Sequence, residues 1–311
     1  MISKDFEKLN ENYPSVITVG TFDGIHLGHQ QLIKKVIQIS SEENLKSIVL
    51  TFDPHPRSVL ENNKNISLLN THQEKENILI PSGLDFLVKK KFTMEFSKMS
   101  SVDFVKNILI HRLNLKHLVI GHDHHFGRNR TANITQLMEY SKLYNFKVTQ
   151  VDAFKLNGIS VSSTKIRNLI KDGNIDEANR FLGYNMFLSG TVVAGKGRGK
   201  KIGFPTANIL LDQLKIKPGN GVYLISSIFA GIKIYGMMNI GNNPTFDDKI
   251  PSIEVHFFDF DKKIYDDNIS IQIIKRIRDE IKFSGSDELS NQLIEDKKKC
   301  IEFISRNKKS P

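Results

Sequence analysis

Short apolar runs alternate with helical periods through the first half of the chain. Three runs of six or seven residues predict buried strands: Ser15–Gly20, Ser47–Phe52 and Leu115–Gly121. Between the first two, Gln30–Ile39 repeats its apolar residues on one helical face, at Leu32, Ile33, Val36 and Ile37. Strands that are separated by helices predict a parallel sheet with right-handed crossovers. Ligands of such sheets bind at the carboxyl ends of the strands.

A further helix is predicted to begin before the third strand. Ser100-x-x-Asp103 matches a capping box, in which the serine caps the helix. Three apolar residues at helical spacing follow it: Val105, Ile108 and Leu109. The overlapping segment Ser97–Ser101, SKMSS, is similar to the signature loop of class I tRNA synthetases. The capping role explains it better, because the chain carries no anticodon-binding module.

The period changes in the second half. From about Phe187 onward, short apolar segments are separated by glycines and by Asp/Asn pairs. They predict four strands: Gly221–Phe229, Ile232–Gly241, Ser252–Phe258 and Ile269–Ile274. Strands without intervening helices are typical of an antiparallel barrel.

A final helix is predicted from about Asp287 to Ile304. Its apolar face would comprise Leu289, Leu293, Ile294, Ile301 and Ile304. The change of period places the domain boundary near Gly183–Phe187. The sequence therefore predicts an α/β N-terminal domain with a Rossmann-like parallel sheet, residues 1–184, and a C-terminal antiparallel β-barrel with a terminal helix, residues 185–311. A length of 311 residues agrees with two domains.

Charge and composition narrow the class of partner. A net charge of +10 and a pI near 9.4 favour an anionic partner such as phosphorylated small molecules, although a lysine-rich surface explains the excess equally well. The chain has no long basic block and no Trp, so nucleic acid is not expected. No apolar run approaches the roughly 18–20 residues that span a bilayer, so no membrane association is expected. The polar N-terminus lacks a secretory signal and Cys300 is the only cysteine, which together predict a cytoplasmic protein. The oligomeric state is not predicted.

The most informative motif is Gly20–His29, GTFDGIHLGH, which joins a predicted strand to a helix. Its three glycines allow the backbone to turn sharply and to approach a ligand closely. His26 and His29 stand at the helix start, where free backbone N–H groups and the helix dipole attract phosphate. Imidazoles there can donate hydrogen bonds to a phosphate oxygen as charge develops. A histidine metal pair and a plain surface turn remain alternatives for this motif.

Three later motifs narrow the family. TFDPHP (Thr51–Pro56) and GHDHHFG (Gly121–Gly127) end two strands, and VSSTKIR (Val161–Arg167) precedes a helix. The HxGH motif resembles the signature of the nucleotidyltransferase superfamily. In this order the four motifs resemble the adenylyltransferase module of the prokaryotic bifunctional riboflavin kinase/FMN adenylyltransferase family, over roughly residues 14–183. The resemblance implies a Rossmann-like nucleotidyltransferase domain that adenylylates FMN to FAD with ATP and Mg²⁺ and releases pyrophosphate.

The resemblance also implies roles for individual residues. His26 and His29 would be catalytic and would hold the ATP triphosphate. The ATP and phosphate site would contain Gly20, Phe22, Asp23, Gly24, His26, Gly28, His29, Ser162, Ser163, Thr164 and Arg167. The flavin side would contain Asp53, Pro54, Asp123 and Phe126.

Two positions depart from the family pattern. His125 and Lys165 stand where the family usually has Arg, and these side chains are not equivalent as phosphate partners. A riboflavin kinase with an impaired adenylyltransferase half is therefore the alternative function. A zinc site at His122, His124 and His125 is not expected, because no Cys or carboxylate set accompanies them.

The second half carries a glycine-rich loop with cations. Gly195–Lys201 reads GKGRGKK and Gly203–Asn208 reads GFPTAN. Alternating glycines and cations suit a loop that wraps phosphates, although the Walker A spacing is absent and a flexible hairpin is the alternative for the loop alone. Thr206 and Asn208 add oxygen ligands of the type that Mg²⁺ prefers.

Four further motifs complete an ordered set: PGNGVY (Pro218–Tyr223), NIGNNPTF (Asn239–Phe246), EVHFFDFD (Glu254–Asp261) and IRDEIKF (Ile277–Phe283). The set resembles the riboflavin kinase domain, a compact β-barrel, over roughly residues 185–305. The resemblance implies phosphorylation of riboflavin to FMN by ATP, so the expected partners are the small molecules riboflavin, FMN and ATP.

The same resemblance assigns the kinase residues. Glu254 would be the general base on the terminal ribityl hydroxyl, and Thr206 and Asn208 would bind Mg²⁺. The ATP site would contain Gly195, Lys196, Gly197, Arg198, Gly199, Lys201, Pro205, Thr206 and Asn208, and the flavin site would contain Asn239, Arg278 and Phe283. The alternation of SIEVHFF places Glu254 and His256 on one side of the strand. A solvent-facing glutamate is the alternative for Glu254. Asp266 stands where the family typically has Gly, which concerns turn geometry.

Overall fold

The computed structural model describes residues 1–9, 12–61, 66–122, 134–195, 197–241 and 252–308, apart from the side chains at 198, 201 and 308. The chain forms two compact units, Met1–Ser163 and Thr164–Pro311, and each is described by itself. Within the described residues, no helix combines the length and the apolar character that a membrane crossing needs.

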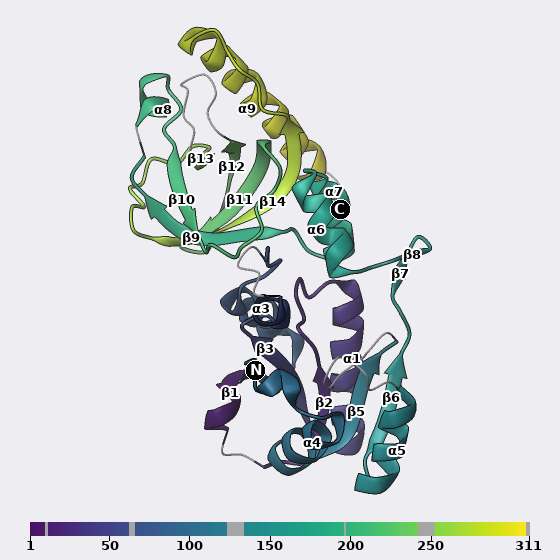
Figure 1. The fold of residues 1–311 in the computed structure, drawn as a ribbon. Helices are drawn as coiled ribbons and strands as arrows, with labels where there is room; N and C mark the ends of the chain where they lie inside the picture. The colour runs from purple at the N-terminus through teal and green to yellow at the C-terminus, as the bar shows by residue number, and fades with distance from the viewer. Residues whose placement is uncertain (10–11, 62–65, 123–133, 196, 242–251, 309–311) are drawn as a thin grey trace. The chain divides into compact units, whose positions relative to one another are not determined.

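The first unit is built on a six-stranded sheet with the order β1-β4-β3-β2-β5-β6 (Figure 1). All of its strand pairs are parallel. The strands are β1 (Ile2–Asp5), β2 (Ser15–Val19), β3 (Lys46–Asp53), β4 (Phe86–Lys91), β5 (Leu115–Gly121) and β6 (Lys147–Val151), and a small hairpin follows, β7 (Lys155–Leu156) and β8 (Ile159–Ser160). The predicted parallel, Rossmann-like sheet is confirmed.

The helices of this unit are η1 (Phe6–Lys8), α1 (Leu27–Glu43), α2 (Pro56–Leu60), α3 (His72–Leu79), η2 (Ile80–Ser82), η3 (Phe96–Lys98), α4 (Ser101–Asp103), η4 (Phe104–Arg112) and α5 (Ile134–Tyr144). They lie around the sheet, with α1 on one face and η4 and α5 on the other. Ser100 caps α4 as predicted, because its hydroxyl accepts a hydrogen bond from the Asp103 N–H at 3.1 Å.

Alternate strand residues serve two separate cores. Val16 and Val49 point to the face that α1 covers, whereas Ile17 and Leu50 point to the face that η4 and α5 cover. Because the central strands are buried on both sides, their sequences are mostly apolar, with a few buried polar residues such as Thr18, Thr51 and His117, which is the pattern of a doubly wound sheet. The polar residues of a ligand site can therefore collect where the strands end, and the predicted motifs follow the carboxyl ends of β2 and β3.

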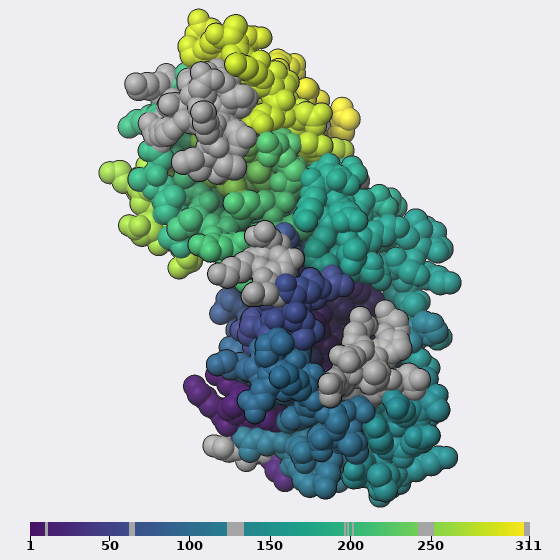
Figure 2. Space-filling model, viewed as in Figure 1, coloured from purple at the N-terminus to yellow at the C-terminus, as the bar shows by residue number. Residues whose placement is uncertain are grey.

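The second unit contains a closed barrel with the strand order β10-β13-β12-β11-β14-β9. Its strands are β9 (Phe187–Val193), β10 (Ala207–Leu211), β11 (Gly221–Phe229), β12 (Ile232–Gly241), β13 (Ser252–Phe257) and β14 (Asn268–Arg278). All pairs are antiparallel, as the sequence predicted. The helices of this unit are α6 (Ser163–Lys171), α7 (Ile175–Leu182), α8 (Arg198–Lys201) and α9 (Ser286–Lys308). In the space-filling view, the yellow helix α9 covers one side of the green barrel strands (Figure 2).

The buried face of α9 differs from the predicted one. Ile294 and Ile301 are about half exposed, at 53% and 46%, whereas Asp296 and Cys300 are fully buried. The helical spacing explains this result: Leu293, Asp296, Cys300 and Ile304 follow one stripe at intervals of three and four residues, and Ile294 and Ile301 fall beside it. The periodicity predicted the helix, but the polar Asp296 concealed which stripe faces the barrel.

Helices α6 and α7 pack with the barrel. The Asn179 amide on α7 donates to the Ile273 carbonyl at 2.9 Å and its oxygen accepts from the Met186 N–H at 2.7 Å. Along the sequence, the first compact unit ends at Ser163 and the second begins at Thr164, which is upstream of the boundary that the change of period predicts. The functional boundary at 184/185 stays a prediction.

Candidate active sites

The turn after β2 holds a strained backbone shape. Phe22 and Ile25 have positive φ angles of 46° and 33°, and Gly24 between them has φ 91°. Positive φ is unfavourable for residues with a Cβ, and such conformations persist only where the surroundings enforce them. Here the side chains of Phe22 and Ile25 are buried in the core at 2% and 0% exposure. The core therefore fixes the shape of the turn that leads to the histidines.

His26 and His29 are held face to face at the start of α1. His26 is the N-cap residue, and its Nδ1 accepts a hydrogen bond from the His29 N–H at 3.3 Å. The two rings stack with centroids 3.7 Å apart and planes 14° apart. Because Nδ1 of His26 accepts this bond, the N–H group that its ring can offer to a ligand is on Nε2. The predicted histidine pair thus lies at the phosphate-binding end of a helix.

His29 is kept neutral by its surroundings. Burial lowers the pKa of its imidazole well below 6.5, and the charges of His26 and Lys75 lower it further. Its Nδ1 is sheltered from solvent and meets no hydrogen-bond partner among the described residues. The ring also contacts Phe22, with centroids 5.1 Å apart. A neutral imidazole is a hydrogen-bond donor that a phosphate oxygen can use.

Asp23 points inward and ties the turn to neighbouring segments. Its carboxylate accepts from the backbone N–H groups of Leu69 and Asn70, at 2.9 and 3.1 Å. Its backbone carbonyl accepts from the Ser163 hydroxyl at 2.7 Å. Ser162, beside it, is exposed. The structure therefore brings Ser163 of the VSSTKIR motif to the HxGH turn, and it gives Asp23 a supporting position.

The predicted flavin side is described only in part. Asp53 and Pro54 are exposed at the carboxyl end of β3, and the peptide bond between them is cis. Asp123 and Phe126 lie outside the described residues. Thr164 and Arg167 lie on α6, in the second compact unit.

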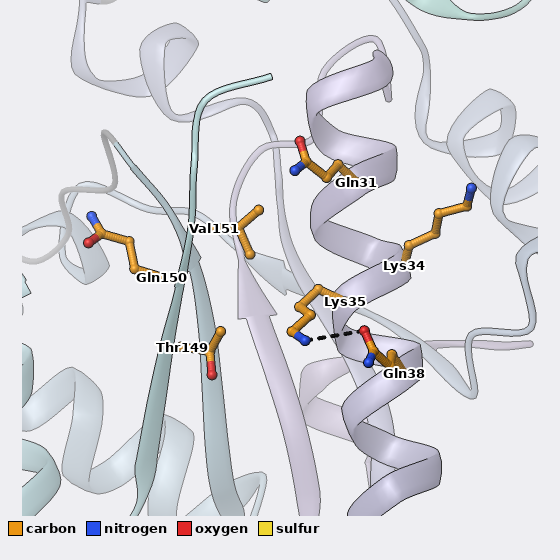
Figure 3. Close-up of a pocket in the computed structure, with 7 residues that line it drawn as sticks. All are labelled: Gln31, Lys34, Lys35, Gln38, Thr149, Gln150 and Val151. Atoms are coloured by element: carbon orange, nitrogen blue, oxygen red, sulfur yellow. Dashed lines mark hydrogen bonds between the residues drawn. The ribbon is translucent and has the colours of Figure 1, made fainter. Parts of the chain in front are cut away.

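A cavity of ≈ 370 Å³ lies between α1 and β6. It is lined by Gln31, Lys34, Lys35, Gln38, Thr149, Gln150 and Val151, from α1 and β6. Gln31 and Lys35 project from α1 toward β6, whereas Lys34 points away (Figure 3). None of the predicted site residues lines it.

Three predicted kinase residues form one row across the barrel. Glu254 on β13 pairs in register with Asn208 on β10 and with Asn239 on β12. Residues that pair directly across antiparallel strands point to the same face, and neighbouring strands lie about 4.8 Å apart. Residues far apart in the sequence are thereby placed side by side, on the face that also carries Val222 and the core under α9.

Oxygen atoms gather at Glu254. One carboxylate oxygen accepts from the Thr206 hydroxyl at 3.3 Å and the other accepts from the Ser252 hydroxyl at 3.3 Å. Glu254 and Thr206 are half-buried rather than solvent-facing. With the Asn208 amide in the next position of the row, hydroxyl, amide and carboxylate oxygens form the hard donor set that suits Mg²⁺.

His256 supports this site. The sequence predicted that it shares a side of the strand with Glu254 but gave it no role. Its Nδ1 lies 2.9 Å from the Pro205 carbonyl, so the ring donates its Nδ1–H to the residue before Thr206. Burial lowers the pKa of this imidazole. The alternation E-x-H was the available signal, but the partner carbonyl lies 51 residues upstream.

The glycine-rich loop comes too close to Asn208 and Phe204 for side chains. A Cβ at Gly195 would lie 1.9 Å from the Asn208 amide nitrogen, and one at Gly199 would lie 2.2 Å from the Phe204 carbonyl oxygen. Gly197 has φ 68°, which glycine adopts freely. Lys196 lies outside the described residues, as do the side chains of Arg198 and Lys201.

Arg278 is anchored by a residue that the sequence did not single out. Its Nε lies 2.9 Å and its Nη2 2.8 Å from one oxygen of the buried Asp296 carboxylate on α9. The guanidinium also lies over the Phe283 ring, with its carbon 5.7 Å from the centroid. The structure thus joins Arg278 and Phe283, the two predicted flavin residues at the end of β14.

Comparison with known proteins matches two separate parts of the chain to two family models. The family model described as FAD synthetase matches residues 8–165, and the one described as riboflavin kinase matches residues 182–304. A solved structure titled as a macrolide-efflux protein from Streptococcus pneumoniae is 31% identical, with a TM-score of 0.87 over 96% of this chain and 98% of that one. It shows that the fold is shared over nearly the whole chain.

Curated relatives match both halves at once. The bifunctional riboflavin kinase/FMN adenylyltransferase of Buchnera aphidicola subsp. Schizaphis graminum is 37% identical over 97% of this chain and 96% of its own length. The protein of the same name from Listeria monocytogenes is 39% identical over 94% and 93%. Relatives that are named for two activities do not favour a kinase with an impaired partner half. The chain therefore belongs to the bifunctional riboflavin kinase/FMN adenylyltransferase family.

Proposed function

We propose that this chain phosphorylates riboflavin to FMN on its barrel and adenylylates FMN to FAD on its parallel-sheet unit, with ATP as the donor in both steps. The observation that carries the proposal is the presence of two unlike phosphate sites. One is the stacked pair His26 and His29 at a helix N-terminus, and the other is the row Asn208–Glu254–Asn239.

On the barrel, Glu254 acts as the general base. Its carboxylate accepts the proton of the terminal ribityl hydroxyl, whose oxygen then attacks the γ-phosphorus of ATP. The bond from the γ-phosphorus to the bridging oxygen breaks, and ADP leaves with the electron pair. Thr206 orients the carboxylate through the 3.3 Å hydrogen bond, and His256 holds the preceding carbonyl. Arg278 and Phe283 border the flavin at the end of β14.

Thr206 and Asn208 would hold the Mg²⁺ ion, because their side-chain oxygens are of the type that it prefers. When bound, Mg²⁺ neutralises charge on the phosphates of ATP. The Gly195–Lys201 segment would wrap those phosphates with backbone N–H groups and cations. Its glycines at 195 and 199 permit the close approach to Asn208 and Phe204.

On the sheet unit, no general base is required. A phosphate oxygen of FMN attacks the α-phosphorus of ATP, the bond to the bridging α–β oxygen breaks, and pyrophosphate leaves with the electron pair. His26 and His29 donate hydrogen bonds to the triphosphate, while the helix N-terminus contributes free N–H groups. Ser162, Ser163, Thr164 and Arg167 would steady the departing pyrophosphate. We also propose a cytoplasmic location, where ATP is available.

Complementation between two variants tests this division of labour. Glu254→Gln protein should convert added FMN to FAD but leave riboflavin untouched. His29→Ala protein should stop at FMN. With riboflavin and MgATP, neither variant alone should yield FAD, whereas an equimolar mixture should yield it through free FMN. A variant that loses both steps while still folded would contradict the assignment of one step to each site.

A further inference from the structure

Lys75 is a buried ammonium beside the HxGH turn. Its side chain reaches from α3 to the Thr21 carbonyl, with Nζ 2.8 Å from the oxygen, and the residue is 6% exposed. Burying a lysine is unfavourable unless partners compensate, so such a residue calls for a specific role. Burial indeed lowers the pKa of this amine, while the carboxylates of Asp23 and Asp53 oppose that effect.

The segment around Lys75 is attached to the turn at two places. Upstream, the N–H groups of Leu69 and Asn70 bind the Asp23 carboxylate. Downstream, Lys75 binds the carbonyl of Thr21, two residues before Asp23. Between these contacts, Thr71 and Glu74 form a complete capping box that fixes the start of α3. Because the start of α3 is fixed in this way, the Lys75 ammonium has a defined position against the turn.

The contact acts on the strained part of the turn. Fixing the Thr21 carbonyl fixes the peptide plane that precedes Phe22, whose φ of 46° begins the left-handed stretch. That stretch leads directly into His26, the N-cap residue of α1. Lys75 also carries a positive charge close enough to His29 to act on its imidazole. The Lys75 side chain thus influences both the shape of the turn and the charge at the start of α1.

We infer that Lys75 is a positioning residue for adenylyl transfer, because its ammonium holds the Thr21 carbonyl and so keeps the Gly20–His26 turn in its phosphate-binding shape. The inference rests on the function proposed above for this turn. It also connects the turn to the end of β3, since the Asp53 carboxylate acts on the same ammonium. The Lys75 ammonium would then also contribute a buried positive charge to the site that is proposed to bind the triphosphate.

The fold does not depend on this contact alone. The Thr51 hydroxyl also donates to the Thr21 carbonyl, at 3.1 Å, so removal of the ammonium leaves the carbonyl with a partner. Met is unbranched and nearly as long as Lys, so Lys75→Met preserves the packing of the stem. Arg restores the charge and the donors but is larger. The two substitutions therefore separate the ammonium from the packing.

The test measures FAD formation from FMN and MgATP in the full-length chain. Lys75→Met should lower kcat/KM for ATP at least tenfold, and Lys75→Arg should recover a substantial part of the loss. A packing role predicts the reverse order, with Met better tolerated than Arg. Riboflavin phosphorylation on the barrel should stay within twofold in both variants, as should both steps in Lys106→Met, which removes an exposed lysine of the same unit.

Two further variants make the outcome decisive. Thr51→Val, which removes the other donor to the same carbonyl, should change kcat/KM less than threefold, and a larger loss than in Lys75→Met would overturn the inference. Wild-type kinetics in Lys75→Met would overturn it as well. If His29→Ala also left FAD formation intact, the proposed function of the turn would fail. If His29→Ala stopped FAD formation while Lys75→Met did not change it, only the role of Lys75 would fail.

Discussion

The two candidate sites achieve a phosphate-binding geometry by opposite means. On the parallel sheet, neighbouring residues of one short segment create the site, and buried side chains such as Phe22 and Ile25 hold its backbone in a strained form. On the barrel, residues from three strands meet in one register row, and the backbone there is regular. The first site is local in sequence and the second is assembled by the fold.

This difference affects how each site tolerates change. The strained turn of the first site persists only while the buried side chains of Phe22 and Ile25 and the buried hydrogen bonds hold it. Substitutions that remove these interactions should therefore disrupt the site. A register site depends on each polar side chain separately, since the ladder of the barrel keeps the row in place after a substitution. Substitutions on the barrel should therefore affect catalysis with little loss of stability, whereas those near the HxGH turn should affect both.

The largest effect is expected for Glu254→Gln. The amide keeps the size of the carboxylate and can accept one of its two hydrogen bonds. It cannot accept the hydroxyl proton, so riboflavin phosphorylation should fall about 10³-fold. Rates of FMN formation, measured by flavin chromatography, test this expectation. The thermal midpoint should stay within a few degrees of wild type. A fall of less than tenfold would mean that another group removes the proton.

His29→Ala should lower FMN adenylylation by about 10²-fold, since one donor to the developing charge is removed. It should also weaken the first unit, because the stack with His26 and the contact with Phe22 are lost. The matched control is His111→Ala on η4, which removes an exposed imidazole of the same unit and should leave the rate within a few-fold. An unchanged rate in His29→Ala would remove the histidine pair from the mechanism.

The sequence predicted the local site more fully than the assembled one. The strand, the turn and the helix that carry GTFDGIHLGH are contiguous, so their pattern alone placed His26 and His29 at a helix start. The row on the barrel was not predictable, because strand register is a property of pairing and not of any single segment. The sequence identified Asn208, Glu254 and Asn239 separately, and only the fold showed that they are neighbours.

Buried polar partners were missed for a related reason. Lys75 lies in the polar stretch His72–Asn77 that begins α3, and Asp296 interrupts the apolar stripe of α9. Periodicity treats a charged residue as exposed unless its partner is known. The partners here, Thr21 and Arg278, lie 54 and 18 residues away in the sequence. Such pairs become visible only when tertiary contacts are known.

Gly195→Ala should have a smaller effect, confined to the barrel site. The new methyl group would lie 1.9 Å from the Asn208 amide nitrogen, so the amide must shift from its place beside Glu254. Asn208 is proposed to bind Mg²⁺, and we expect the KM for MgATP in riboflavin phosphorylation to rise about tenfold with little change in kcat. Gly231→Ala provides the control, because nothing lies near its Cβ position; its φ of 80° should reduce stability slightly without changing KM.

The smallest expected effect concerns pH and distinguishes the two units. Burial keeps the pKa of folded His29 well below the unfolded value of 6.5, so above pH 6.5 both states are neutral and His29 adds no pH dependence. As the pH falls below 6.5, the unfolded chain binds a proton that the folded chain refuses, and the free energy of unfolding decreases until the folded pKa is reached. Between pH 7.5 and 5.5, this difference amounts to about 1 kcal/mol. In hydrogen-exchange measurements on β2 amides, wild-type protein should lose about that much more opening free energy than His29→Gln over this interval, since all other histidines are common to both proteins. Amides of β11 in the barrel should show no such difference between the two proteins, and an equal loss in β2 would mean that His29 is protonated in the folded state.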